Sequence, residues 1–144
     1  MEAFITVYSN LSVIELFNEF IICSKHTLML ALLLQKLEIH DKALLVLDYM
    51  RDLAEDTNNN YEAMIAYEEM GKMYQEMKEY KMAIRAFKRM LQIAWVENDQ
   101  RNETLAYEYL SLQHYYLQNI TKAQIYKEKA FYGDLELPNS VLKR

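Results

Sequence analysis

The sequence predicts an all-α fold, an α-solenoid of stacked antiparallel helix pairs, and three observations support this prediction. A pattern of residues recurs three times at a spacing of 40 residues. Within each copy, the apolar residues recur at the spacing of an amphipathic helix. The 144 residues include 2 glycines and 1 proline, although 52% are hydrophobic. This composition favours long helices over a fold rich in glycine and proline turns.

The repeat is clearest at positions that hold small residues. Two series keep the spacing without a gap: Ala43, Ala83 and Ala123, and Ala31, Gly71 and Ser111. Large side chains follow the same spacing, as Tyr67 and Tyr107 do. We expect the small residues to let paired helices approach closely, and Phe87 to fill the space between one such pair.

Each copy is predicted to contain two helices. In the middle copy the first helix starts near Asn60, with Asn59 or Asn60 as its cap. The letters "KEY" then break the apolar phase, and a second helix is predicted over residues 81–96 before "ENDQRN" ends it. The predicted unit is therefore a helix, a tight turn, a second helix and a longer polar loop.

The middle copy resembles a tetratricopeptide repeat, because Tyr67, Met70-Gly71, Tyr74, Ala83 and Phe87 follow the order and spacing of that family. Such repeats usually have about 34 residues, so the resemblance is to a long variety. The extra residues are expected in the loops "AEDTNNN" and "VENDQRN".

The third copy departs from the family pattern at two positions. His114 stands where an aromatic residue is usual, and Lys127 stands where phenylalanine is usual. The fold that the resemblance implies is a superhelix of stacked pairs, and the function that it implies is the binding of other proteins.

The repeat organises residues 1–144 as one helical domain. Its predicted units are a partial N-terminal repeat at 1–22, three repeats at 23–62, 63–102 and 103–136, and a C-terminal tail at 137–144. Phe4, Val7, Leu11 and Ile14 would give the first unit an apolar end face, whereas solenoids need polar terminal faces for solubility. We therefore expect a piece of a longer solenoid or a subunit that self-associates end to end, with ends that act as unusual caps as the alternative.

The sequence contains no residue pattern that predicts catalysis, a metal site or a cofactor. His26, His40 and His114 are far apart in the repeat, and the single Cys23 can build neither a zinc site nor an internal disulfide. No glycine-rich phosphate loop is present. We expect a protein that is not an enzyme and that binds no metal and no cofactor.

Charge and hydropathy restrict the partners. The net charge is -5 and the pI is about 5.2, which argues against nucleic acid. The most apolar run, residues 27–34, is shorter than the roughly 20 residues of a membrane span. Because Glu2 precedes the first apolar residues, a secretory signal is not expected. We expect a cytoplasmic protein. Its long repeats and its richness in tyrosine, asparagine and glutamine loosely resemble tetratricopeptide proteins of cilia and flagella.

The resemblance also implies a partner groove, because tetratricopeptide proteins bind along the concave side, which the first helix of each pair lines. The corresponding positions are Lys25, Leu28, Leu32, Gln35 and Lys36, then Ile65, Glu68, Lys72, Gln75 and Glu76, then Leu105, Glu108, Leu112, Tyr115 and Tyr116. The set suits an amphipathic helix or an extended segment with some positive charge. Glu68 and Glu108 would repel the carboxylate tail that chaperone adaptors of this family bind.

These expectations favour a non-catalytic scaffold or adaptor that binds a protein or peptide partner. A regulatory solenoid gated by a peptide or small ligand is a second hypothesis, and it predicts compaction on binding. An RNA-binding helical repeat is a third, because Lys81, Arg85, Lys88 and Arg89 form a basic stripe along one second helix. A solvated outer face explains this stripe as well.

Overall fold

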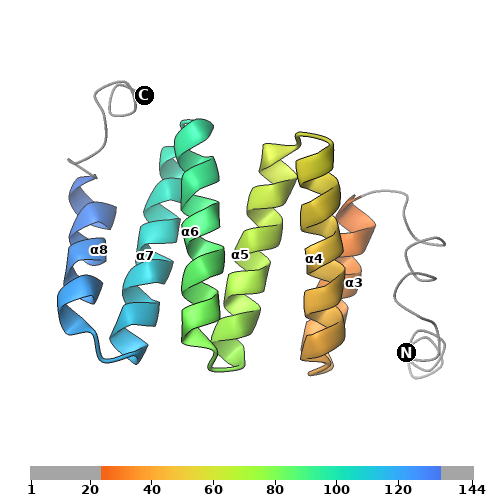
Figure 1. Cartoon of the computed structure of the whole chain (residues 1–144), viewed down its shortest axis with the longest axis horizontal. Coiled ribbons are helices and arrows are strands. Elements are labelled where there is room, and N and C mark those ends of the chain that lie inside the picture. Colours follow the sequence, from red (N-terminus) through yellow and green to blue (C-terminus); the bar gives the residue numbers. More distant parts are fainter. Residues whose placement is uncertain (1–23, 134–144) are drawn as a thin grey trace.

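The structure, a computed structural model, describes residues 24–133 as a row of helices. The helices are α3 (Ser24–Lys36), α4 (His40–Asp56), α5 (Asn60–Glu76), α6 (Tyr80–Val96), α7 (Gln100–Tyr116) and α8 (Ile120–Tyr132). They stand side by side in chain order, so that α3 and α8 form the two ends of the row (Figure 1). Consecutive helices pack against each other and the described residues contain no strand, which confirms the all-α, solenoid-like fold.

Several expectations concern residues outside the described range. They are the partial repeat at 1–22, the apolar end face of Phe4, Val7, Leu11 and Ile14, the role of Cys23, and the tail at 137–144. Lys25 lies within α3, but its side chain is outside the described part of the chain. These expectations stay predictions.

All five connections between the described helices have the same backbone. Each is three residues long, and its middle residue has a φ between 55° and 61°: Glu38, Asn58, Lys78, Asn98 and Gln118. After α5, the Lys78 N–H donates to the Gln75 carbonyl at 2.9 Å, and the Glu79 N–H donates to the Tyr74 carbonyl at 2.8 Å. This is the Schellman arrangement, which satisfies carbonyls at the helix end, and it recurs after α3, α4, α6 and α7.

The expected longer polar loop between repeats is therefore wrong. The helices α4 to α7 have 17 residues each, so a helix and its turn make a 20-residue step, and two steps make the repeat. The stretches "AEDTNNN" and "VENDQRN" lie partly inside helices, because α4 continues to Asp56 and α7 begins at Gln100. The extra residues lengthen the helices, and the predicted boundaries at 63 and 103 fall inside α5 and α7.

Each turn also begins the next helix. Asn59, Asp99 and Asn119 accept a hydrogen bond from the backbone N–H three residues further on. The prediction that Asn59 or Asn60 caps this helix is thus confirmed, with Asn59 as the cap, and such a cap contributes about 1 kcal/mol. At the equivalent positions Ile39 and Glu79 make no side-chain cap bond.

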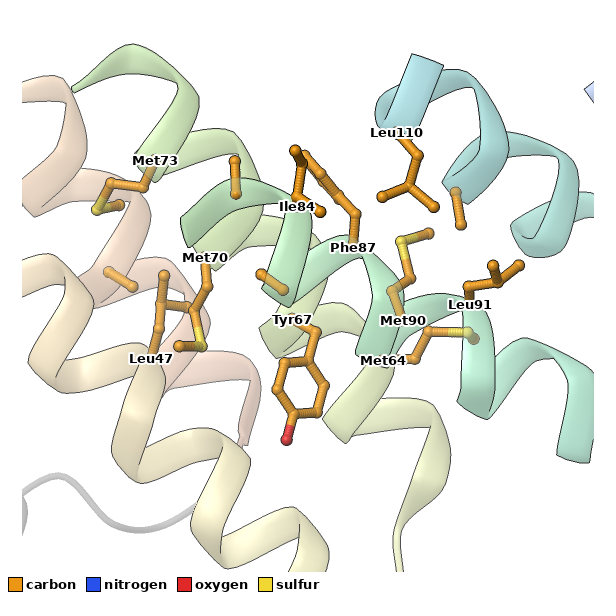
Figure 2. Packing of buried hydrophobic residues seen from close by; sticks show 14 of the residues in the cluster. Leu47, Met64, Tyr67, Met70, Met73, Ile84, Phe87, Met90, Leu91 and Leu110 are labelled. Carbon is orange, nitrogen blue, oxygen red and sulfur yellow. The ribbon is translucent and has the colours of Figure 1, made fainter. Parts of the chain in front are cut away.

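A continuous hydrophobic core joins the repeats. Figure 2 shows buried side chains of successive helices packed together, among them Leu47 of α4, Met70 of α5, Phe87 of α6 and Leu110 of α7. The predicted structural positions are buried, with Ser111 half-buried: Ala31, Ala43, Tyr67, Gly71, Ala83, Phe87, Tyr107 and Ala123. The core therefore does not divide at repeat boundaries, as expected where each repeat packs on its neighbours.

The contact between Gly71 and Phe87 sets the spacing of α5 and α6. A Cβ atom at Gly71 would lie 2.5 Å from the Phe87 ring. That ring cannot move aside easily, because it is fully buried and stacks on Tyr109 with ring centroids 4.4 Å apart. One repeat earlier the equivalent pair is Ala31 and Leu47. Here alanine is larger than the glycine of the later pair, and leucine is smaller than its phenylalanine.

We predict that Gly71→Ala lowers the free energy of unfolding by about 1–2 kcal/mol, since overpacking outweighs the better helix propensity of alanine. Adding Phe87→Leu, which copies the Ala31 and Leu47 pair, should recover part of the loss. Thermal unfolding followed by circular dichroism measures both effects. A higher melting temperature for Gly71→Ala alone would contradict this packing.

Candidate functional site

The predicted groove residues of α3, α5 and α7 bridge neighbouring helices. The Gln35 Nε2 of α3 donates to the Glu76 Oε1 of α5 at 2.8 Å. The Gln113 Nε2 of α7 donates to the Gln75 Oε1 of α5 at 2.6 Å. These two bonds join the first helices of the three pairs to one another.

A charged cluster ties α5 to α7 in the same layer. The Tyr109 hydroxyl donates to Glu68 at 2.9 Å, and the Lys72 ammonium lies 3.3 Å from Glu68 and 3.1 Å from Glu69. Burial and the bond to Glu68 raise the pKa of Tyr109 to about 12. Burial alone would lower the pKa of Lys72, but the carboxylates of Glu69 and Glu68 raise it above its ordinary value. The phenol and the ammonium thus keep their protons at neutral pH.

The middle of the predicted groove is consequently occupied by contacts within the chain. Glu68, Lys72 and Gln75 bond to residues of α5 and α7, while Leu28, Leu32, Ile65 and Leu105 are half-buried. Lys36 is exposed. The Tyr116 ring stacks on Tyr80 of α6 at a centroid distance of 4.9 Å.

The structure instead forms an open groove of about 1020 Å³ between α7 and α8, which we call the α7–α8 groove. Its α7 side consists of Thr104, Glu108, Ser111, Leu112 and Tyr115. Its α8 side consists of Ile120, Ala123, Gln124, Lys127, Glu128, Ala130, Phe131 and Tyr132. Three of the predicted groove residues, Glu108, Leu112 and Tyr115, are thus brought together here.

The sequence reasoning missed the α8 side of this groove. Phe131 is 80% exposed and Tyr132 is 73% exposed, and their rings lie edge to face with centroids 4.7 Å apart. The search for a groove considered first helices alone, so these second-helix residues were not candidates. One available signal was Lys127, which replaces the core phenylalanine of the preceding repeat and marks a surface that stays open.

His114, the other departure from the family pattern, lies buried between α7 and α8. Its ring stacks on Tyr126 at a centroid distance of 5.3 Å, and neither ring nitrogen has a hydrogen-bond partner within the described residues. Burial lowers the pKa of this imidazole, and the charges of Lys122 and Lys88 lower it further. The histidine therefore acts as a neutral core side chain near pH 7.

A second polar cluster joins α4, α5 and α6. The Tyr67 hydroxyl donates to Glu55 at 2.5 Å, while the guanidinium groups of Arg51 and Arg89 lie 5.9 Å and 5.6 Å from the centre of its ring. Arg89 also lies 3.5 Å from Glu55. Arg89 of the predicted basic stripe is thus engaged within the chain, and Arg85 contacts the Met82 sulfur at 3.8 Å. All four residues of the stripe, Lys81, Arg85, Lys88 and Arg89, are exposed.

The described residues hold no group of three or more histidine, cysteine, aspartate or glutamate side chains that could bind a metal ion. In the same range no helix has the length and apolar character of a membrane span. Comparisons with family models, with curated proteins and with solved structures returned no match.

We predict that stability falls as the pH drops from about 7 to about 5, in part because of His114. Its pKa in the folded state lies below the ordinary value of 6.5, so the unfolded chain binds more protons in this range. The contribution of the neutral His114 side chain to the free energy of unfolding is complete above about pH 6.5 and is lost as the pH falls through its lowered pKa. His114→Phe should flatten the dependence of the urea midpoint on pH.

The control is Ile125→Ala, which changes an exposed residue of α8 without an ionisable side chain and should leave the pH dependence unaltered. If His114→Phe and the unaltered chain lost stability in parallel, the buried imidazole would not be the cause.

Proposed function

We propose that this chain is a non-catalytic protein-interaction module of tetratricopeptide type, and that the α7–α8 groove is its binding surface. The observation that supports this is the exposure of neighbouring large side chains there: Leu112 is 37% exposed, Tyr115 is 61% exposed and Phe131 is 80% exposed. A contiguous apolar surface with a polar rim typically marks a contact with another protein.

The groove is formed by two helices that already pack on the rest of the core. Binding would order little of this chain, so most of the contact energy remains available for affinity. Tyr115 and Tyr132 offer large rings with hydroxyl groups at their edges, a combination enriched at interfaces. A single bound segment of this kind corresponds to a dissociation constant of roughly 1 µM, about −8 kcal/mol. We place such an adaptor in a cytoplasmic assembly.

The double variant Leu112→Glu/Tyr115→Ala should lose the partner without losing helicity, because both side chains are exposed at the groove. Capture from native cell extract, quantified by mass spectrometry, should show a protein depleted at least about 10-fold with the variant.

Leu53→Glu/Tyr61→Ala is the matched control. It makes the same two changes at residues that are 40% and 64% exposed on α4 and α5, away from the groove. The control should capture the same proteins as the unaltered chain. Equal capture by all three chains would reject the groove as the functional surface.

A further inference from the structure

The α7–α8 groove corresponds, one repeat later, to the surface of α5 and α6 on which α7 packs. Because the pairs repeat every 40 residues, each groove residue has an equivalent one repeat earlier. Glu68, the equivalent of Glu108, accepts the hydrogen bond from Tyr109. Gln75, the equivalent of Tyr115, accepts the hydrogen bond from Gln113. The equivalents of two groove residues therefore bond directly to the next first helix.

Ring contacts show the same correspondence. Tyr80, the equivalent of Ile120, stacks on Tyr116 of α7. Phe87, the equivalent of Lys127, stacks on Tyr109. The groove thus continues an interface that already exists inside the molecule.

Exposure gives the clearest contrast between the occupied surface and the open one. Leu91 of α6 is 5% exposed and belongs to the core cluster with Leu110 of α7. Its equivalent on α8, Phe131, is 80% exposed. Within residues 24–133 no helix covers α7 and α8 on this side.

We propose that the α7–α8 groove seats one basic, amphipathic α-helix of a partner protein, in the way that α5 and α6 seat α7. This inference rests on the proposed function and specifies the partner for the same surface. Helices with an apolar face commonly bind in grooves of this kind. The seat of α7 supplies the orientation and the register of the bound helix.

Charge selects a basic helix. At the positions equivalent to the groove, the surface that seats α7 has the charged side chains Glu68, Lys72 and Lys88. The α7–α8 groove has Glu108, Lys127 and Glu128, so its carboxylates outnumber its ammonium group. Opposite charges on a partner would be attracted to this surface and would fix its register.

Two positions of the bound helix are specified. At the register of Tyr109, a hydroxyl or cationic donor would reach Glu108, to which no side chain of the described residues donates. At the register of His114, the charges of Lys122 and Lys88 both disfavour a positive charge on α7. The groove residue equivalent to Lys88 is Glu128, so a lysine or arginine would be favoured there.

The probes are fluorescein-labelled synthetic peptides with the sequence of residues 100–116, which is α7, made basic by Thr104→Lys and Glu108→Lys at two positions that line the α7–α8 groove in the whole chain. The parent peptide, a His114→Lys peptide, a Tyr109→Phe peptide and a helix-breaking Leu110→Pro peptide are titrated with the whole chain by fluorescence anisotropy. We expect the His114→Lys peptide to bind tightest. Tyr109→Phe should weaken binding about 10-fold, as loss of a hydrogen bond to a charged group does, and Leu110→Pro should abolish it.

Two protein variants locate the peptide. Phe131→Asp should weaken binding at least about 10-fold. Ile125→Asp, a matched change at a 45% exposed residue of α8 outside the groove, should leave binding unchanged. With Glu108→Ala, the parent and Tyr109→Phe peptides should bind equally, because the acceptor is gone.

Each contrary result overturns the inference in a defined way. Binding that is equal for the Leu110→Pro peptide, or unaffected by Phe131→Asp, rejects a seated helix. If no peptide binds but the Leu112→Glu/Tyr115→Ala variant still fails to capture the protein that the unaltered chain captures, the proposed function is supported. The inference that the partner binds as a basic helix is then rejected. If light scattering shows that the chain alone is a multimer and that Phe131→Asp dissociates it, the occupant is a second copy.

Discussion

The left-handed residue in each turn is the constraint on which the rest of the structure depends. It closes one helix through two backbone hydrogen bonds and starts the next within three residues. Because the same turn follows both first and second helices, each helix from α4 to α7 together with its turn takes 20 residues. A positive φ costs about 1–2 kcal/mol at a residue other than glycine, and the chain accepts this cost at five positions.

The equal steps determine which residues meet. They bring Gln35 to Glu76 and Gln75 to Gln113, so that first helices bond side by side. They also place Gly71 against Phe87, where the absent side chain of one residue makes room for the ring of the other. The same register, continued one pair further, leaves Phe131 and Tyr115 exposed on the α7–α8 groove. The candidate site therefore repeats an internal interface on which, within residues 24–133, no further helix packs.

The sequence predicted the helix pairs and the core because both depend on the spacing of apolar residues, which can be read directly from the sequence. It predicted the tight turn within a pair but not the equally tight turn between pairs, because the left-handed conformation is adopted here by glutamate, lysine and glutamine as well as asparagine. The alanines at 43, 63, 83 and 123 already show the 20-residue step, but Glu103 interrupts the series and is itself buried. Glu108, Leu112 and Tyr115 of the α7–α8 groove were predicted. Its α8 residues were not, because their exposure depends on the absence of a further packed helix within residues 24–133, which the repeat pattern does not reveal.

Replacing Lys78 by glycine tests most directly whether the left-handed turn sets the step. Lys78→Gly should raise the free energy of unfolding by about 0.5–1 kcal/mol, since the relief of a strained φ exceeds the entropy that glycine adds to the unfolded chain. The matched variant Lys88→Gly, at an exposed position within α6, should instead lower it by about 1 kcal/mol. Chemical denaturation of both chains gives the comparison. If Lys78→Gly were destabilised as much as Lys88→Gly, the residue would not hold the left-handed conformation and the equal-step account would be wrong.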